Sequence, residues 1–258
     1  MRKSNQIFMS KIFKEIYDKS IKNPEEFWKN ASEDIFWFKK PTKILNKSNP
    51  PFYKWFEDGI TNTCYNALDV HIEQGRGDKI ALIYDSPITG SKNKFTFKEL
   101  RSKVSKFAGA LKAQGANKGD RVIIYMPMIP EAVVAMLACA RIGAIHSVVF
   151  GGFASSELAS RIDDSKAKLL VTASCGFEPG RTVEYKPLVD EAIKIANHKI
   201  KKMILFQRTG HEVKLNAPSE VSWDEVMTNA NDADCTEMNS NEFAYILYTS
   251  GTTGTPKG

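Results

Sequence analysis

The sequence predicts an α/β fold in which mostly parallel sheets are flanked by helices. From Ile80 onward, short apolar segments alternate with segments whose apolar residues recur at helical spacing. The strand-like segments are apolar throughout rather than at every second position, which is typical of strands covered on both faces. Strands and helices that alternate in this way indicate a parallel sheet joined by crossover helices.

The individual elements follow from local signals. A capping box, Thr96-Phe97-Lys98-Glu99, begins a helix that should end before Gly115, and a second box, Ser222-Trp223-Asp224-Glu225, begins a short helix. Pro130 is placed at the first position of another helix. We expect strands at 121–126, 144–150, 168–172, 203–206 and 243–248, and helices at 130–142, 155–164 and 187–196.

The first seventy residues differ from the rest of the chain. Aromatic residues cluster there between prolines with little periodicity, and three of the four tryptophans lie in this segment. We expect residues 1–70 to be an irregular segment that lays aromatic side chains against a larger body, and residues 71–258 to form a separate domain. Ligand stacking on these rings stays open, although no convergent polar groups accompany them.

Composition excludes several classes of function. The 36 basic and 30 acidic residues give a net charge of +6, and acidic residues are spread among the lysines, which argues against a nucleic-acid partner. The longest charge-free apolar run, 132–140, is too short to span a membrane. The cysteines and histidines show no metal-ligand spacing, so we expect no metal site and a buried Cys139. The N-terminus has no signal-peptide pattern, which favours a cytoplasmic location.

The last ten residues, Thr249–Gly258, form a loop rich in Gly, Ser and Thr after a predicted buried strand. Gly251 and Gly254 allow close approach of the backbone, hydroxyl groups donate hydrogen bonds, and Lys257 offsets negative charge, a combination that suits a polyphosphate. A flexible surface turn is the alternative. The glycine spacing excludes a Walker A loop. The candidate phosphate-binding residues are Thr249, Ser250, Gly251, Thr252, Thr253, Gly254 and Lys257.

This loop resembles the phosphate loop of the adenylate-forming (AMP-binding) superfamily, which includes the acyl-CoA synthetases. The resemblance implies that the loop holds the β- and γ-phosphates of ATP, bridged by Mg²⁺. Residues 1–70 resemble the N-terminal extension of the short-chain branch, whose members activate acetate or propionate. The segments Tyr125–Glu131 and His146–Phe153 also match that branch.

A second loop, Glu178–Arg181, carries information about coenzyme A. It resembles a loop of acetyl-CoA synthetases in which two arginines receive the coenzyme A phosphates; here Arg181 matches the second, and Glu178 replaces the first. The resemblance implies that coenzyme A is bound by Glu178, Pro179, Gly180, Arg181, Gly151 and Gly152. The two glycines at 151 and 152 are equally compatible with a simple turn. This version of the loop, followed by the segment Thr182–Ala192, is similar to propionyl-CoA synthetases. Thr252 and Thr255 in the phosphate loop favour the same enzymes.

The reaction implied by the resemblance has two steps. Propionate and ATP give propionyl-AMP and pyrophosphate, and coenzyme A then displaces AMP to give propionyl-CoA. The catalytic residues of the family match no position here and are expected beyond residue 258, so we expect an adenylation domain truncated at its phosphate loop and inactive by itself. Two alternatives remain: an acetyl-CoA synthetase, or a non-catalytic module that binds a nucleotide or coenzyme A.

Overall fold

The computed structural model describes residues 11–249 and Gly258, and the chain divides into two compact units. One comprises the residues up to Thr61 together with Asn239–Asn241, and the other comprises Asn62–Met238 and the residues from Glu242 onward. The domain boundary expected after residue 70 stays a prediction. Within the described ranges, no helix combines the length and the apolar character needed to cross a membrane.

The described part of the first unit begins with two helices, α1 (Lys11–Lys22) and α2 (Pro24–Ala31), so the expectation of an irregular segment was wrong here. Asn23 caps α2 by accepting a hydrogen bond from the amide of Glu26, and Pro24 occupies the first helical position. Pro24, one of the prolines of the segment expected to be irregular, therefore begins a helix, because its fixed φ suits the first turn.

Aromatic and carboxylate contacts hold the rest of this unit together. The rings of Trp28 and Trp55 meet edge to face with centroids 6.4 Å apart. The carboxylate of Asp58 accepts hydrogen bonds from the hydroxyl and amide of Thr42 and from the amide of Lys43, and these bonds lower its pKa. The short elements here are a 3₁₀ turn (Ser32–Asp34) and the strands β1 (Leu45–Asn46), β2 (Lys54–Trp55) and β3 (Ile60–Thr61).

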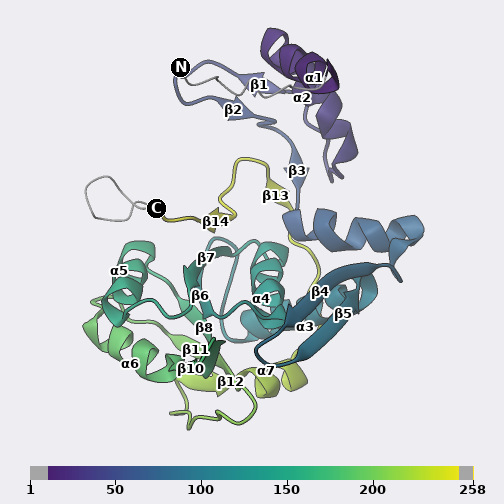
Figure 1. Cartoon of the computed structure of the whole chain (residues 1–258). Coiled ribbons are helices and arrows are strands. Elements are labelled where there is room, and N and C mark those ends of the chain that lie inside the picture. The colour runs from purple at the N-terminus through teal and green to yellow at the C-terminus, as the bar shows by residue number, and fades with distance from the viewer. Residues whose placement is uncertain (1–10, 250–257) are drawn as a thin grey trace, which may run out of the picture. The chain divides into compact units, whose positions relative to one another are not determined.

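The second unit is built on a six-stranded sheet whose neighbouring strands are all parallel, which confirms the predicted fold class (Figure 1). Every residue of β8 is buried, because helices cover both faces of the sheet. In spatial order the strands are β12 (Glu220–Ser222), β11 (Lys202–Phe206), β8 (Leu169–Ala173), β6 (Arg121–Met126), β7 (Ile145–Phe150) and β14 (Tyr245–Ile246).

The helices form two groups beside this sheet. On one side α3 (Phe97–Ala113) packs with α4 (Pro130–Arg141) and α7 (Trp223–Asn229), and on the other α5 (Ser155–Ser165) packs with α6 (Tyr185–Ile195) (Figure 1). The predicted capping box at Thr96 and Glu99 is formed. The second box is not, because Ser222 makes no side-chain capping bond and is held in β12, opposite Leu205 of β11.

The last strand differs from its prediction. A buried strand was expected at 243–248, but β14 covers only Tyr245–Ile246, and among the described residues it pairs with β7 alone. Tyr245 of this edge strand is exposed, and so are Phe243 and Leu247, which lie within the predicted span but outside β14. The hairpin of β4 (Ile80–Ser86) and β5 (Ser91–Thr96) was not predicted, and two π-helical segments, η2 (Tyr65–Asp69) and η3 (Ile72–Arg76), precede it.

A buried ion pair joins segments that are distant in the sequence. The Arg141 side chain is 1% exposed, and its Nη1 and Nη2 lie 2.8 and 3.1 Å from the two carboxylate oxygens of Asp69. Its Nε donates to the carbonyl of Ala233 at 2.6 Å. The last residue of α4 thereby fixes the end of η2 and the segment that follows α7. Arg101 completes the group at 3.2 Å from Asp69, with its side chain 37% exposed.

We expect the substitution Arg141→Met to lower the free energy of unfolding by about 3–5 kcal/mol, because it leaves the Asp69 carboxylate buried with only a peripheral partner. Urea unfolding followed by circular dichroism measures the loss. The matched control is Arg101→Met, which removes the more exposed arginine from the same carboxylate and should cost about 1 kcal/mol or less. Equal losses for the two variants would contradict this assignment.

His146 makes the sheet sensitive to acid. It lies on β7 with its ring 5.8 Å from that of Tyr245, and its Nδ1 is buried without a hydrogen-bond partner among the described residues. Burial lowers its pKa to about 4. The folded chain therefore resists protonation at this residue.

Between about pH 7 and pH 4.5 we expect the wild type to lose roughly 2 kcal/mol more stability than His146→Gln. The unfolded chain takes up a proton near the ordinary histidine pKa of about 6.5, whereas the folded chain does so only near 4. The unfolded state thus binds more protons in this window, so the free energy of unfolding decreases as the pH decreases. Urea midpoints at several pH values measure the difference, and parallel curves for both proteins would refute the role of His146.

Candidate functional site

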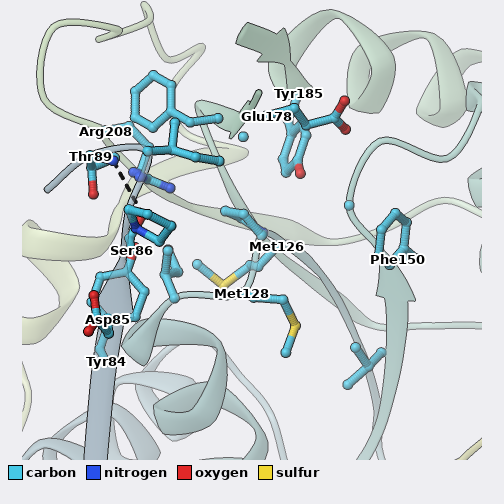
Figure 2. A pocket seen from close by; sticks show the side chains of 18 of the residues that line it. Tyr84, Asp85, Ser86, Thr89, Met126, Met128, Phe150, Glu178, Tyr185 and Arg208 are labelled. Atoms are coloured by element: carbon cyan, nitrogen blue, oxygen red, sulfur yellow. Dashed lines mark hydrogen bonds between the residues drawn. The ribbon is translucent and has the colours of Figure 1, made fainter. Parts of the chain in front are cut away.

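A cavity of about 310 Å³ opens at the carboxyl ends of the central strands (Figure 2). Met126 ends β6 and Phe150 ends β7, and both line it. From β6 the chain continues to β7 on one side and then crosses to β8 on the other side of β6. Such a change of direction opens a crevice beyond the strand ends, where ligands bind in α/β sheets. The topology therefore places the cavity at the expected position.

The lining is largely apolar with a few polar groups. Met126, Met128 and Phe150 line the cavity together with the turn of the β4–β5 hairpin, and Glu178 and Arg208 also face it (Figure 2). Met128 is 87% exposed and Phe150 64% exposed, so part of this apolar surface is open to solvent. A narrow apolar cleft with charged groups near it suits a ligand with an uncharged stem and an ionic end.

Gly151, one of the residues predicted from the coenzyme A resemblance, lines this cavity and can only be glycine. A Cβ there would lie 2.3 Å from the hydroxyl of Tyr185 and 2.9 Å from the carbonyl oxygen of Met126. A Cβ at Gly176 would also lie 2.3 Å from this hydroxyl. The position of the Tyr185 ring therefore requires glycine at both residues, and the ring forms a wall of the cavity.

Tyr185 was missed as a site residue by sequence reasoning, although it lies in the segment Thr182–Ala192 that follows the predicted loop. Its side chain is buried, and burial raises its pKa to about 12, so it is a neutral phenol at physiological pH. Its ring lies 5.0 Å from that of Tyr125. The available signal was its place four residues after the predicted Glu178–Arg181 loop, just before a predicted helix.

Gly152 lies close to the predicted Glu178. Its φ of +97° is in the region that favours glycine, and its amide donates to the hydroxyl of Tyr125 at 3.0 Å. A Cβ at Gly152 would be 3.8 Å from Oε1 of Glu178, so no side chain separates the two residues. The structure therefore brings together Gly151–Gly152 and the Glu178–Arg181 loop, which are separate in the sequence.

The Glu178–Arg181 loop is the turn of a hairpin between β9 (Cys175–Glu178) and β10 (Arg181–Glu184). Pro179 followed by Gly180, with φ of +76°, is the combination that a type II turn requires. Arg181 is 70% exposed, and its Nε and Nη2 lie 2.7 and 2.6 Å from Oε2 of Glu178. The guanidinium is therefore presented to solvent while one carboxylate oxygen holds it in place.

Arg208 is the second residue that sequence reasoning missed. It follows β11, its amide donates to Oγ of Ser174 at 2.9 Å, and its guanidinium lies 4.6 Å from the centre of the Phe177 ring. A second hollow of about 620 Å³ adjoins the cavity and shares this arginine. Glu131 lines that hollow, and burial raises its pKa. The signal that could have found Arg208 is its position just after a predicted parallel strand.

The predicted phosphate loop lies mostly outside the described residues. Thr249 is described, three residues after β14. Ser250, Gly251, Thr252, Thr253, Gly254 and Lys257 fall outside the described ranges. Their assignment to ATP phosphates therefore stays a prediction.

Comparison with protein families gives two matches. The family described as AMP-binding enzyme matches residues 69–258, and the family described as acetyl-coenzyme A synthetase N-terminus matches residues 13–67. Together they account for almost all of the chain.

Several acyl-CoA synthetases are similar in sequence to most of this chain. The human protein named acyl-CoA synthetase short-chain family member 3, mitochondrial, is 55% identical over 247 residues, which cover 95% of this chain and 36% of that protein. An acetyl-coenzyme A synthetase from Shewanella frigidimarina is 44% identical over 259 residues, covering 98% of this chain and 40% of its own. This chain thus spans well under half the length of these relatives.

A solved structure agrees with the sequence relatives. Acetoacetyl-CoA synthetase from Streptomyces lividans matches with a TM-score of 0.82 and 26% identity, over 92% of this chain and 36% of that one. The AMP-binding family match covers well over half of the residues, and the N-terminal match is to the acetyl-coenzyme A synthetase type. The chain therefore belongs to the AMP-binding enzyme family, in its short-chain acyl-CoA synthetase branch.

Proposed function

We propose that this chain is the N-terminal part of an ATP-dependent, AMP-forming acid–thiol ligase that converts propionate to propionyl-CoA. Family membership and the short-chain relatives support the reaction class. Within this proposal, residues 1–70 are the N-terminal extension and residues 71–258 belong to the adenylation domain. The cavity between Gly151 and Glu178, with Arg181 beside it, is the observation that carries the proposal.

The cavity suits coenzyme A in this proposal. Its apolar lining of Met126, Met128 and Phe150 offers a path for the uncharged pantetheine stem. Arg181 at the hairpin turn supplies a charge-assisted hydrogen bond to a coenzyme A phosphate, and Arg208 adds a second positive charge. Glu178 must yield the Arg181 guanidinium when the phosphate binds, because one carboxylate oxygen now holds it.

The loop at Thr249–Gly258 is assigned to the ATP phosphates. It offers hydroxyls, backbone amides and the Lys257 ammonium but no carboxylate, a donor set that suits phosphate oxygens rather than direct ligation of a cation. Mg²⁺ would therefore be held by the phosphates and water, where it offsets phosphate charge. The loop and the Lys257 ammonium would position the triphosphate so that pyrophosphate can be displaced from the α-phosphorus.

The proposed chemistry divides between this chain and the remainder of a longer protein. A carboxylate oxygen attacks the α-phosphorus of ATP and expels pyrophosphate, and the thiolate of coenzyme A then attacks the acyl carbon and expels AMP. This chain would supply the phosphate loop for the first step and the coenzyme A cleft for the second. Because it spans only 36–40% of its relatives, we assign the acyl pocket and the catalytic groups to the part that it does not include.

Acetate is the second candidate substrate. Relatives named acetyl-coenzyme A synthetase, from Shewanella frigidimarina and Streptomyces avermitilis, are 44% and 45% identical to this chain. Propionate is favoured by Glu178 in place of an arginine and by Thr252 and Thr255 in the loop, which are similar to propionyl-CoA synthetases. A cytoplasmic location also stays a prediction, since the human relative is named as mitochondrial.

We expect Arg181→Ala to weaken binding of coenzyme A by about tenfold, which corresponds to roughly 1.4 kcal/mol from a lost phosphate contact. Glu178→Gln should strengthen binding several-fold, because it removes the carboxylate that competes for the guanidinium. Titration calorimetry with the purified chain measures both effects.

Two controls accompany this measurement. Lys194→Ala removes a cation whose side chain is 75% exposed and which lies on α6 outside the cavity, so coenzyme A affinity should not change. Pantetheine, which lacks the phosphates, should bind wild type and Arg181→Ala equally. If Arg181→Ala binds coenzyme A as tightly as the wild type, the assignment of Arg181 is wrong.

For the longer protein that contains this chain, we expect carboxylate-dependent pyrophosphate exchange to be faster with propionate than with acetate or butyrate at equal concentration. The specificity constants of the three acids decide the order. A clear preference for acetate would replace propionate by the second candidate. Exchange with none of the three acids would leave only a non-catalytic nucleotide- or coenzyme-binding role.

A further inference from the structure

Two cysteines and one carboxylate from distant parts of the second unit come together away from the cavity. The Sγ atoms of Cys64 and Cys235 and a carboxylate oxygen of Asp69 all lie within 4.8 Å of one another. Cys64 is fully buried, whereas Cys235 is partly exposed. The two thiols are hydrogen-bonded to each other.

We propose that Cys64 and Cys235 are a modification site, a dithiol that a hydroperoxide converts to a reversible disulfide. The two Sγ atoms lie within 4.8 Å of each other, so they must approach by less than about 3 Å to reach the disulfide bond length of about 2.05 Å. The role is separate from the proposed coenzyme A binding, because neither cysteine lines the cavity.

The backbones around the pair are already held in place. The side chain of Asn62 is buried; its oxygen accepts from the amide of Cys64 at 2.8 Å, and its nitrogen donates to the carbonyl of Thr236 at 2.8 Å. One amide side chain thus bridges the residues beside both cysteines. A disulfide would form between segments that are fixed at a short separation, which favours it over a chance encounter of flexible loops.

The charges around the sulfurs favour oxidation over binding of a metal ion. Nη1 of Arg141 lies 3.7 Å from Sγ of Cys64. The hydrogen bond from Cys235 and this positive charge lower the pKa of Cys64, whereas the same hydrogen bond and burial raise the pKa of Cys235. Cys64 is therefore the thiolate of the pair, suited to attack an oxidised Cys235. A divalent cation here would be repelled by the same guanidinium, and Asp69 already binds Arg141 and Arg101 through its carboxylate.

The order of events follows from exposure. The partly exposed Cys235 is the sulfur that a hydroperoxide can reach. Its thiol attacks the hydroperoxide and the O–O bond breaks; the thiol proton leaves with the departing oxygen, which for hydrogen peroxide gives a sulfenic acid and water. The buried Cys64 thiolate then attacks Sγ of Cys235 and releases hydroxide, which takes up a proton from solvent. In sum, two thiols and hydrogen peroxide give one disulfide and two waters, so the protein loses two electrons and two protons.

The bond would link the two places where the chain passes between the units. Cys64 lies three residues after Thr61, and Cys235 lies four residues before Asn239, where the chain returns to the first unit. Oxidation therefore cross-links the two ends of the segment Asn62–Met238, which makes up most of the second unit. Because the enclosed loop is long, the cross-link should raise the unfolding temperature by about 5 °C or more.

The test treats the purified chain with hydrogen peroxide, blocks the remaining thiols and maps the peptides by mass spectrometry. We expect a Cys64–Cys235 peptide that dithiothreitol reverses, together with the higher unfolding temperature. Cys64→Ser should leave Cys235 as a sulfenic acid that dimedone traps, and Cys235→Ser should leave Cys64 unmodified. Cys175→Ala, which removes another buried cysteine, should oxidise like the wild type.

Two outcomes would overturn the proposal. The first is a wild type in which Cys64 and Cys235 are both still blocked by the thiol reagent after peroxide treatment. The second is one equivalent of Zn²⁺ retained after dialysis by the wild type and lost in Cys64→Ser, which would assign the pair to a metal ion. The wild-type peptide map decides the matter even if a variant fails to fold.

Discussion

The buried Arg141–Asp69 ion pair is the interaction on which the second unit depends. Arg141 ends α4, Asp69 ends η2, and the same guanidinium reaches the carbonyl of Ala233, so three segments that are far apart in the sequence meet at one charge. Burying two charged groups costs desolvation free energy, which is offset only when the groups pair and hydrogen-bond with each other. This requirement fixes how the chain enters the second unit and how it leaves α7, and it places Cys64 beside Cys235.

A steric constraint has the same importance for the cavity. The Tyr185 ring fits only because Gly151 and Gly176 lack side chains, and a Cβ at either position would overlap its hydroxyl. The contact between Tyr185, at the start of α6, and the two glycines thereby sets how closely α6 packs against these segments. The cavity wall is a consequence of this packing, and the ligand proposed for it meets a surface that is already formed.

Charge near the cavity is arranged differently from charge in the core. Arg141 is enclosed and structural, whereas Arg181 is exposed and held by a single oxygen of Glu178. An exposed pair of this kind contributes little to stability, so its carboxylate can be exchanged for a phosphate at low cost. Replacing an arginine by Glu178 thus gives the hairpin a competing ligand of its own, while Arg208 remains stacked on Phe177.

The sequence by itself determined the parallel α/β sheet, the helices from Thr96 onward and the branch of the family, because these follow from local periodicity, capping residues and short motifs. It failed at α1 and α2, where aromatic residues obscured a helical pattern, and at β14, whose exposure depends on having one neighbouring strand. Only the tertiary structure brought Gly152 to Glu178, enclosed Tyr185 and joined Cys64 to Asp69 and Cys235. These contacts arise from chain crossings over many residues, for which spacing along the sequence carries no signal.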